Sequence, residues 1–343
     1  MSMSVRICRD EEEWSKLAAR CSYGSIFHDW KFLKTVEKHT GSKLHPLIGL
    51  DGTNPVGLYP LFYMKKFLLG AVFSPPPHAA VPYLGPLILD YDILKLSKKQ
   101  SIFLEFQKAV DDYIATELKA SYTFIITAPG LSDSRPMRWS NYALEPYYNY
   151  RIDLSKGIEN ARNRLAKKLR SGISREMEKG VVVREGTRED LGKLCDLLSG
   201  RYQEQGMALK LSKEYILELY DILSPDHMKI LCVEDGGEVA CGLVDLYYRG
   251  KAYGWIGNPK PKTCTRDLND VLQWESIVSA YKNNCTTYEE LGANTERLCR
   301  YKSKYGPDLV LHYSAKKSGL CGRMAEKAYV KIWKPLGGSI VRN

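Results

Sequence analysis

Several patterns that mark common classes of protein are missing from this sequence. It contains 9 cysteines but no Cys-x-x-Cys pair, and its 6 histidines lack the spacing of metal ligands. Its most apolar stretch, residues 67–73, is far too short to span a bilayer. The sequence therefore predicts no metal site and no membrane-spanning helix, and it favours free, buried thiols in a reducing compartment.

Motifs of familiar enzyme mechanisms are missing as well. The chain has no Gly-x-Ser-x-Gly motif, no Walker loop and no dinucleotide fingerprint, so nothing in it indicates a covalent intermediate. Residues 1–13 are polar and end in an acidic run, which is unlike a signal peptide. We therefore expect a cytoplasmic protein without contact to the membrane interior.

What the chain does contain is typical of a globular protein with two domains. It has 343 residues, of which 44% are hydrophobic and 26% are charged. The net charge is +10, from 50 Lys and Arg against 40 Asp and Glu. That balance suits an anionic partner such as RNA or a phosphorylated small molecule, and a merely basic surface is the alternative.

The order of the predicted elements is similar in the two halves. Apolar spacing and turn signals indicate helices, a hairpin and a strand in each of them. The first half has predicted helices at 11–21, 30–39 and 100–118, a hairpin at 44–63 and a strand at 122–127. The second half has predicted helices at 159–179, 190–205, 214–223, 268–282 and 298–305, and strands at 147–154, 181–184, 228–234, 239–248, 251–256, 288–291 and 309–313. This predicts a duplicated α/β domain, with domains at residues 1–149 and 150–316.

The predicted helix at 159–179 is strongly basic outside its apolar stripe. Arg162, Lys167 and Arg170 lie on its polar faces, where they could contact the phosphates of a nucleic acid such as tRNA. The alternative is a solvated helix face with a few pairs within the helix.

Binding of acetyl-CoA usually depends on a loop of main-chain N–H groups that opens a helix and holds the pyrophosphate. The usual sequence form is Gln/Arg-x-x-Gly-x-Gly/Ala after a strand. Residues 266–272 occupy that place here, and they read Arg-Asp-Leu-Asn-Asp-Val-Leu. This departure argues against ordinary acetyl-CoA chemistry without excluding it.

Four segments, taken in order, resemble one protein family. They are Tyr83-Leu84-Gly85-Pro86 followed by Asp90, the run from Tyr150 to Ser155 leading into 169–181, the helix 268–277 ahead of Tyr288 and Gly292-Ala293, and the segment 298–306. The last one contains Tyr301-Lys302-Ser303-Lys304-Tyr305-Gly306, which is similar to a Phe-Lys-x-x-Phe-Gly pattern. From about Trp14 to Tyr313 the chain resembles the Fem-type aminoacyl transferases and related FemAB-like acyltransferases.

The resemblance implies two tandem GNAT-like domains, the first completed by residues 317–343. It also implies an aminoacyl-tRNA donor, an amine acceptor that is often phosphorylated, and no further cofactor. Lys302 matches a lysine thought to contact acceptor phosphate and the developing oxyanion, with Tyr301 beside it. Lys34 and Asp90 match acceptor-binding positions in the first domain.

Some positions depart from the family or allow a plainer role. Tyr215 lies near a substrate-binding tyrosine of the family, but the arginine expected four residues earlier is Leu211. Asn269 could bind substrate or cap its helix. Lys302 could be an exposed lysine favoured by the helix dipole, whose removal would leave folding nearly untouched.

Lys34 could belong to a solvated helix face, and Asp90 could cap a turn. Three functions stay open at this level: Fem-type aminoacyl transfer, CoA-dependent N-acyl transfer on the same scaffold, and RNA binding without catalysis. The acceptor, the acyl group and the oligomeric state are not determined by the sequence.

Overall fold

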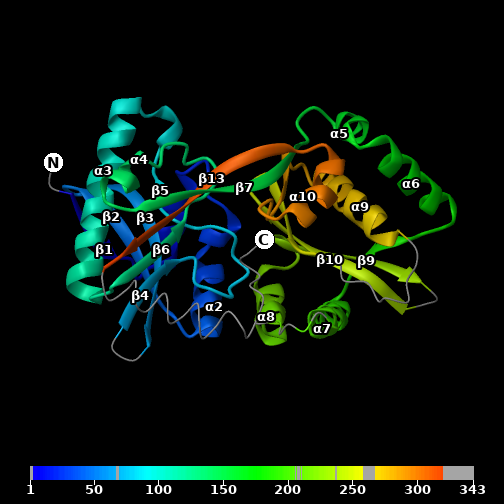
Figure 1. Ribbon diagram of the computed structural model, residues 1–343, viewed down its shortest axis with the longest axis horizontal. Helices are drawn as coiled ribbons and strands as arrows, with labels where there is room; N and C mark the ends of the chain where they lie inside the picture. Colours follow the sequence, from blue (N-terminus) through cyan, green and yellow to red (C-terminus); the bar gives the residue numbers. More distant parts are fainter. Residues whose placement is uncertain are drawn as a thin grey trace. The chain divides into compact units, whose positions relative to one another are not determined.

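The structure is a computed structural model that describes residues 3–66, 69–204, 206, 209, 211–235, 238–257 and 267–319. These residues form two compact units, one made of residues 3–147 and 311–319 and the other of residues 148–310 (Figure 1). Residues 311–316, which the sequence assigned to the second domain, thus belong to the first unit, because their strand pairs there. Residues 317–343 were predicted to complete the first domain, and most of them, residues 320–343, lie outside the described residues.

The first unit is a mixed sheet with helices around it. Its strands lie in the order β1-β2-β3-β4-β6-β13, and β5 pairs with β3. Neighbours along this order are antiparallel except for β4 and β6, which are parallel. The strands are β1 (Met3–Ile7), β2 (Lys43–Asp51), β3 (Asn54–Lys66), β4 (Leu69–Ser74), β5 (Leu87–Ile88), β6 (Tyr122–Ile126) and β13 (Asp308–Ser318). The helices are α1 (Glu11–Ala19), α2 (Trp30–Thr40), α3 (Leu96–Tyr113) and α4 (Arg135–Trp139), with short turns η1 (Ile26–His28), η2 (Tyr91–Ile93) and η3 (Ile114–Leu118).

The second unit repeats this plan. Its strands lie in the order β8-β9-β10-β11-β12-β7, and only β11 and β12 are parallel. The strands are β7 (Ala143–Asp153), β8 (Val183–Glu185), β9 (Met228–Asp235), β10 (Glu238–Tyr248), β11 (Lys251–Ile256) and β12 (Thr287–Glu290). The helices are α5 (Ile158–Arg164), α6 (Lys167–Glu178), α7 (Arg188–Glu204), α8 (Lys213–Leu223), α9 (Leu268–Lys282) and α10 (Glu296–Lys302), followed by the turn η4 (Ser303–Tyr305).

The two sheets therefore share one sequence of strand directions: three antiparallel steps, one parallel step and a final antiparallel step. The sixth strand of each sheet departs from chain order. In the first sheet it is β13, which follows the whole second unit in the sequence, and in the second sheet it is β7, which precedes that unit's other strands. The expected fold class, α/β with mixed sheets flanked by helices, is confirmed.

Two glycines explain how a helix packs on the first sheet. Gly49 on β2 and Gly57 on β3 are register partners, and a Cβ at either one would lie 2.4 Å from the ring of Phe106. That ring, on α3, is fully buried. The paired glycines thus leave the space in the sheet that the phenylalanine fills.

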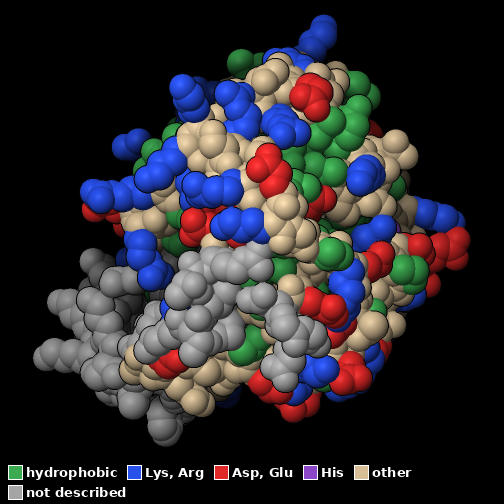
Figure 2. Space-filling view, turned by 90° about the vertical axis from the view of Figure 1, so that its right-hand side faces the viewer, with side chains coloured by type: hydrophobic (Ala, Val, Ile, Leu, Met, Phe, Trp, Pro, Cys, Tyr) green, Lys and Arg blue, Asp and Glu red, His purple; other side chains and the backbone are tan. Residues whose placement is uncertain are grey.

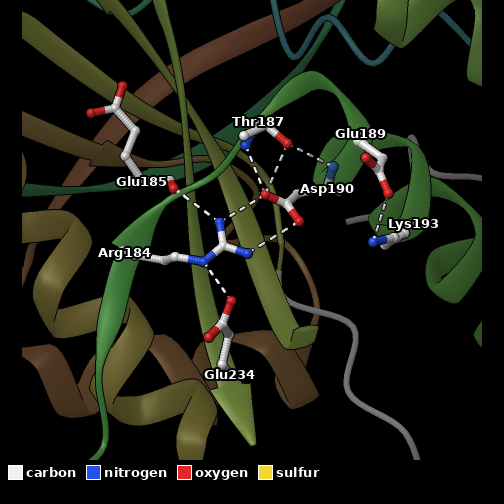
Figure 3. Close-up of polar contacts among 7 residues, drawn as sticks. All are labelled: Arg184, Glu185, Thr187, Glu189, Asp190, Lys193 and Glu234. Carbon is white, nitrogen blue, oxygen red and sulfur yellow. Dashed lines mark hydrogen bonds and ion pairs between the residues drawn. The ribbon is translucent and has the colours of Figure 1, made fainter. Parts of the chain in front are cut away.

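In the second unit an ionic network joins β8 and β9 to the start of α7 (Figure 3). Arg184 on β8 donates to Asp190 (Nη1–Oδ2 2.7 Å) and to Glu234 on β9 (Nε–Oε1 2.6 Å). Asp190 also accepts from the main-chain N–H of Thr187 at 2.8 Å, as in a capping box. Hydrogen bonding from Arg184 lowers the pKa of Asp190 far below its usual range, so the carboxylate stays charged and holds the helix start.

The predicted single helix at 159–179 is wrong. Leu165 and Ala166 have extended backbone (ψ of 140° and 137°), and they separate α5 from α6. Leu165 is buried in the core, and the N–H of Ala166 donates to the carbonyl of Lys304 at 2.8 Å. At the break the N–H of Ala166 therefore bonds to a distant segment of the same unit in place of a helical carbonyl.

Candidate active site

Lys302 is the last residue of α10, and its side chain turns towards the end of β12. Its Nζ donates to the main-chain carbonyl of Leu291 and, at 3.4 Å, to that of Gly292. The residue is partly buried, so the exposed lysine considered from the sequence is not what the structure shows. Because an ammonium has three donors, a third N–H remains beyond the two carbonyls that it contacts among the described residues, and it is available to a ligand.

Gly306 fixes the segment that carries Lys302. It adopts φ of +69°, and a Cβ there would lie 2.4 Å from the carbonyl oxygen of Arg164. Together with the bond from Ala166 to Lys304, this close approach seats residues 302–306 on the break between α5 and α6. The glycine that ends the Tyr-Lys-x-x-Tyr-Gly pattern is thus required by packing as well as by its backbone conformation.

Tyr301 takes part in an aromatic and ionic cluster with the first turn of α9. Its hydroxyl lies 3.2 Å from that of Tyr305, which donates to Asp270 Oδ1 at 3.0 Å. Lys304 donates to both carboxylate oxygens of Asp270, at 2.9 and 3.1 Å, and its Nζ lies 4.3 Å from the centre of the Tyr301 ring. These contacts hold η4 against α9.

Asn269 lies in the same first turn, directly before Asp270. The helix begins at Leu268, with Asp267 at the N-cap position, so the capping role considered for Asn269 is wrong. Residues 258–266, which precede this helix and include Arg266, lie outside the described residues. The place where a pyrophosphate-binding loop would fall is therefore only described from Asp267 onwards.

Two acidic side chains are buried in this part of the second unit, and their charges act on each other. Glu290, the last residue of β12, is 3% exposed, and burial raises its pKa to about 7. Asp245 on β10 is fully buried and accepts hydrogen bonds from Ser276 and, at 3.0 Å, from the hydroxyl of Tyr288. Burial raises the pKa of Asp245 to about 7 as well. Lys302 itself has a pKa lowered by burial, against which the charge of Glu290 acts.

The other predicted site residues lie elsewhere. Tyr215 is 2% exposed and packs in the core of the second unit at the start of α8, where burial raises its pKa. Lys34 and Asp90 belong to the first unit. Lys34 is exposed on α2 and pairs with Glu37, and Asp90 forms an ion pair with Arg20 at the start of η2.

The basic residues predicted to contact tRNA lie together on α5 and α6. Lys167 is exposed, and Arg162 and Arg170 are partly exposed, with bonds to Ser174 (3.4 Å) and Asn163 (3.5 Å) respectively. Figure 2 shows Lys and Arg side chains gathered on the upper part of this face, at the height of α5 and α6 in Figure 1. The broken helix thus still presents a positive surface.

Sequence reasoning missed Glu290 and Asp270. A signal for Glu290 existed, because the predicted strand at 288–291 places Tyr288 and Glu290 on one face by its period of two. A carboxylate on the apolar face of a buried strand is unusual enough to mark a functional candidate. Asp270 carries no such signal, since an acid in the first turn of a helix is common.

Three comparisons with known proteins bear on this arrangement. Residues 159–303, which include Lys302, Glu290 and Asp245, match a family model described as an acetyltransferase (GNAT) domain. The match lies within the second unit. No match was found among curated protein sequences.

The chain is similar in structure, over most of its length, to several solved proteins. A structure described as FemX superposes with a TM-score of 0.71 at 13% identity, covering 97% of this chain and 100% of that one. L-PGS from Bacillus licheniformis gives a TM-score of 0.56 at 13% identity, covering 92% and 95%. A tandem GNAT protein from the clavulanic acid biosynthesis pathway gives 0.52 at 7% identity, covering 92% and 98%.

The GNAT match and these folds together confirm the expected fold, two GNAT-like units in tandem. At such low identities the structural likeness establishes the fold and leaves the donor and the acceptor open. Within the described residues no group of His, Cys, Asp and Glu could hold a metal ion, and no helix is long and apolar enough to cross a bilayer.

Proposed function

We propose that the chain transfers an aminoacyl group from tRNA to an amine acceptor and so forms an amide bond. The observation that carries this proposal is Lys302, a partly buried cation in the GNAT domain, held by two main-chain carbonyls with a donor left over. Similarity of the fold to FemX supports the choice of an aminoacyl donor over other acyl donors.

The reaction needs charge stabilisation more than it needs a nucleophile on the protein. A neutral amine attacks the ester carbonyl, a C–N bond forms, and the carbonyl oxygen becomes an oxyanion. When the intermediate collapses the C–O bond to the tRNA ribose breaks, and the proton from the amine nitrogen passes to the leaving oxygen. Lys302 is suited to stabilise the oxyanion or a phosphate of the acceptor, because a buried ammonium acts through a lower dielectric than one in water.

The basic surface on α5 and α6 supports a polyanionic donor. Arg162, Lys167 and Arg170 would neutralise phosphates of the tRNA, and binding should then weaken steeply with salt. Aminoacyl-tRNA is a cytoplasmic metabolite, and we place the reaction in the cytoplasm.

A second candidate is CoA-dependent N-acyl transfer on the same scaffold. It is favoured by the description of the matching family model as an acetyltransferase domain. In that reaction the bond that breaks is the C–S bond of the thioester, and Lys302 would keep its role.

Turnover separates these candidates. The purified chain is given radiolabelled aminoacyl-tRNA or acetyl-CoA with a panel of amines that includes uridine-diphosphate sugars carrying an amino group. Label should move to an amine from aminoacyl-tRNA and not from acetyl-CoA, and the opposite result would establish the second candidate. Binding of tRNA without transfer to any amine would leave an RNA-binding protein and contradict both.

Lys302 provides the internal test of mechanism. Lys302→Ala should reduce turnover by about a hundredfold or more, on the scale of losing one oxyanion donor. Arg300 is a matched control, since it lies on the same helix, is exposed and pairs with Glu296. Arg300→Ala should retain activity. Unchanged turnover in Lys302→Ala would remove Lys302 from the mechanism.

A further inference from the structure

Glu290 is buried without the bonds that usually accompany a buried carboxylate. It is 3% exposed, and neither of its carboxylate oxygens has a hydrogen-bond partner within the part of the chain that the structure describes. Burial of an unpaired carboxylate is strongly unfavourable, so such a group calls for an explanation in function or in a nearby charge.

Its acidic neighbours show what a purely structural role looks like. Glu289, next to it on β12, accepts from Asn149 at 2.9 Å and contacts Arg151 at 3.5 Å. Asp245 accepts from Ser276 and Tyr288. Each of these carboxylates ties elements together, whereas Glu290 makes no such tie and can act on its surroundings only through its charge.

The charge next to Glu290 is that of Lys302. The Nζ of Lys302 bonds to the carbonyls of Leu291 and Gly292, the two residues that directly follow Glu290 in the chain. The charged groups that act on this pair, besides its two members, are Asp245 on β10, Cys299 on α10 and Lys304 on η4, and the tyrosines that interact with Glu290 are Tyr150 on β7, Tyr288 on β12, Tyr301 on α10 and Tyr305 on η4. Glu290 is the carboxylate that favours the charged form of Lys302.

We propose that Glu290 is a positioning residue that keeps the buried ammonium of Lys302 protonated. This inference rests on the proposed function for its catalytic meaning, since a neutral lysine could not stabilise an oxyanion or a phosphate. The two carbonyls orient the ammonium but carry no full charge, and burial alone favours the neutral amine. The carboxylate of Glu290 supplies the opposing charge, and it does so without forming a direct bond that would block the remaining N–H.

Glu290→Gln tests this because glutamine keeps the size of the side chain and removes its charge. Proteins labelled with ¹³C at the lysine ε-carbons are titrated by NMR, and the Lys302 signal is assigned from its loss in Lys302→Met. In Glu290→Gln the proton affinity of Lys302 should fall by about tenfold or more, the scale of losing one opposite charge nearby. Glu290→Asp should keep most of it.

Glu289→Gln is the matched control, since it removes one carboxylate from the adjacent position on the same strand. Its Lys302 titration should coincide with that of the wild type. Equal titration of Lys302 in Glu290→Gln and in the wild type would overturn the inference. Folding is checked by melting temperature, and because glutamine replaces an unpaired buried carboxylate we expect no loss.

The wild-type protein gives an independent measurement should Glu290→Gln not fold. If Glu290 faces Lys302, the Lys302 signal should show a second, smaller inflection near the titration of Glu290, and a single inflection would count against the inference.

Activity distinguishes this inference from the proposed function. The high-pH limb of the kcat/KM profile should move to lower pH in Glu290→Gln. A shifted Lys302 titration in Glu290→Gln, together with no acyl transfer by the wild type, would refute the proposed function and leave the inference supported.

Discussion

The fully buried Asp245 should make the stability of the second unit depend on pH in an unusual direction. Burial raises the pKa of Asp245 from 3.8 to about 7, so the folded state holds its proton more tightly than the unfolded chain does. Stability is then greatest below the unfolded pKa and falls as pH rises towards the folded one. Most acid-sensitive proteins behave in the opposite way, because their paired carboxylates are lost as pH falls.

The size of the effect follows from the shift. At about 1.4 kcal/mol per pH unit, the full shift corresponds to about 4 kcal/mol, of which about 2 kcal/mol falls between about pH 5 and pH 7. Asp245→Asn should remove this dependence and keep the contacts, because an amide can accept from Tyr288 and donate to the hydroxyl of Ser276, which can rotate.

Urea unfolding at a series of pH values measures the difference. The free energy of unfolding of the wild type should fall relative to that of Asp245→Asn from about pH 5 to pH 7, by about 2 kcal/mol. Asp226→Asn, which removes an exposed carboxylate of the same unit, should give a curve parallel to the wild type. Parallel curves for Asp245→Asn and the wild type would show that Asp245 is not held protonated in the folded state.

Four further predictions follow from the packing and the charges. Gly306→Ala should destabilise the second unit by about 2 kcal/mol or more in chemical unfolding, because of its positive φ and its approach to Arg164; a neutral result would mean that the loop relaxes freely. Gly49→Ala should lower the stability of the first unit by about 1–3 kcal/mol by overpacking against Phe106, and an unchanged free energy of unfolding would show that the Phe106 ring moves aside without cost. Asp190→Ala should reduce the free energy of unfolding by about 2 kcal/mol, because it removes both the cap on the N–H of Thr187 and the carboxylate that pairs with Arg184. Retention of the wild-type melting curve would contradict the network in Figure 3. Replacing the three basic residues of α5 and α6 by Gln should lower the salt dependence of tRNA binding more than replacing Lys16, Lys108 and Lys193, which pair with acids elsewhere.

The fold could be predicted well from the sequence because its signals are local. The hairpin of β2 and β3 follows from the Asp-Gly turn between two apolar runs. The strands predicted at 228–234 and 239–248 likewise correspond to β9 and β10. The break at Leu165 and Ala166 could not be predicted, because the local spacing continues through it as in a helix. What ends α5 is a hydrogen bond to Lys304, far away in the chain, and no window of sequence contains both partners.

Only part of the candidate site could be predicted from the sequence. The pattern around Lys302 identified the right segment, and the structure shows why its spacing matters: Tyr301, Tyr305 and Gly306 each make a distinct packing contact. Burial of Lys302 and the lack of bonds to Glu290 depend on how α10 folds back over the end of β12. Such a property belongs to the tertiary arrangement, and residue types alone do not reveal it.

The late position of β13 in the chain has a consequence for synthesis of the protein on the ribosome. β6 pairs on one side with β4 and on the other with β13, whose pairing residues run from Ser314 to Ser318. The first sheet therefore leaves the ribosome with one edge of β6 open, and it stays open while the whole second unit is being made. An open edge is a template for pairing with other strands. A nascent chain stalled before residue 311 should consequently be far more prone to aggregate than the finished protein, although most of its first unit has already been made.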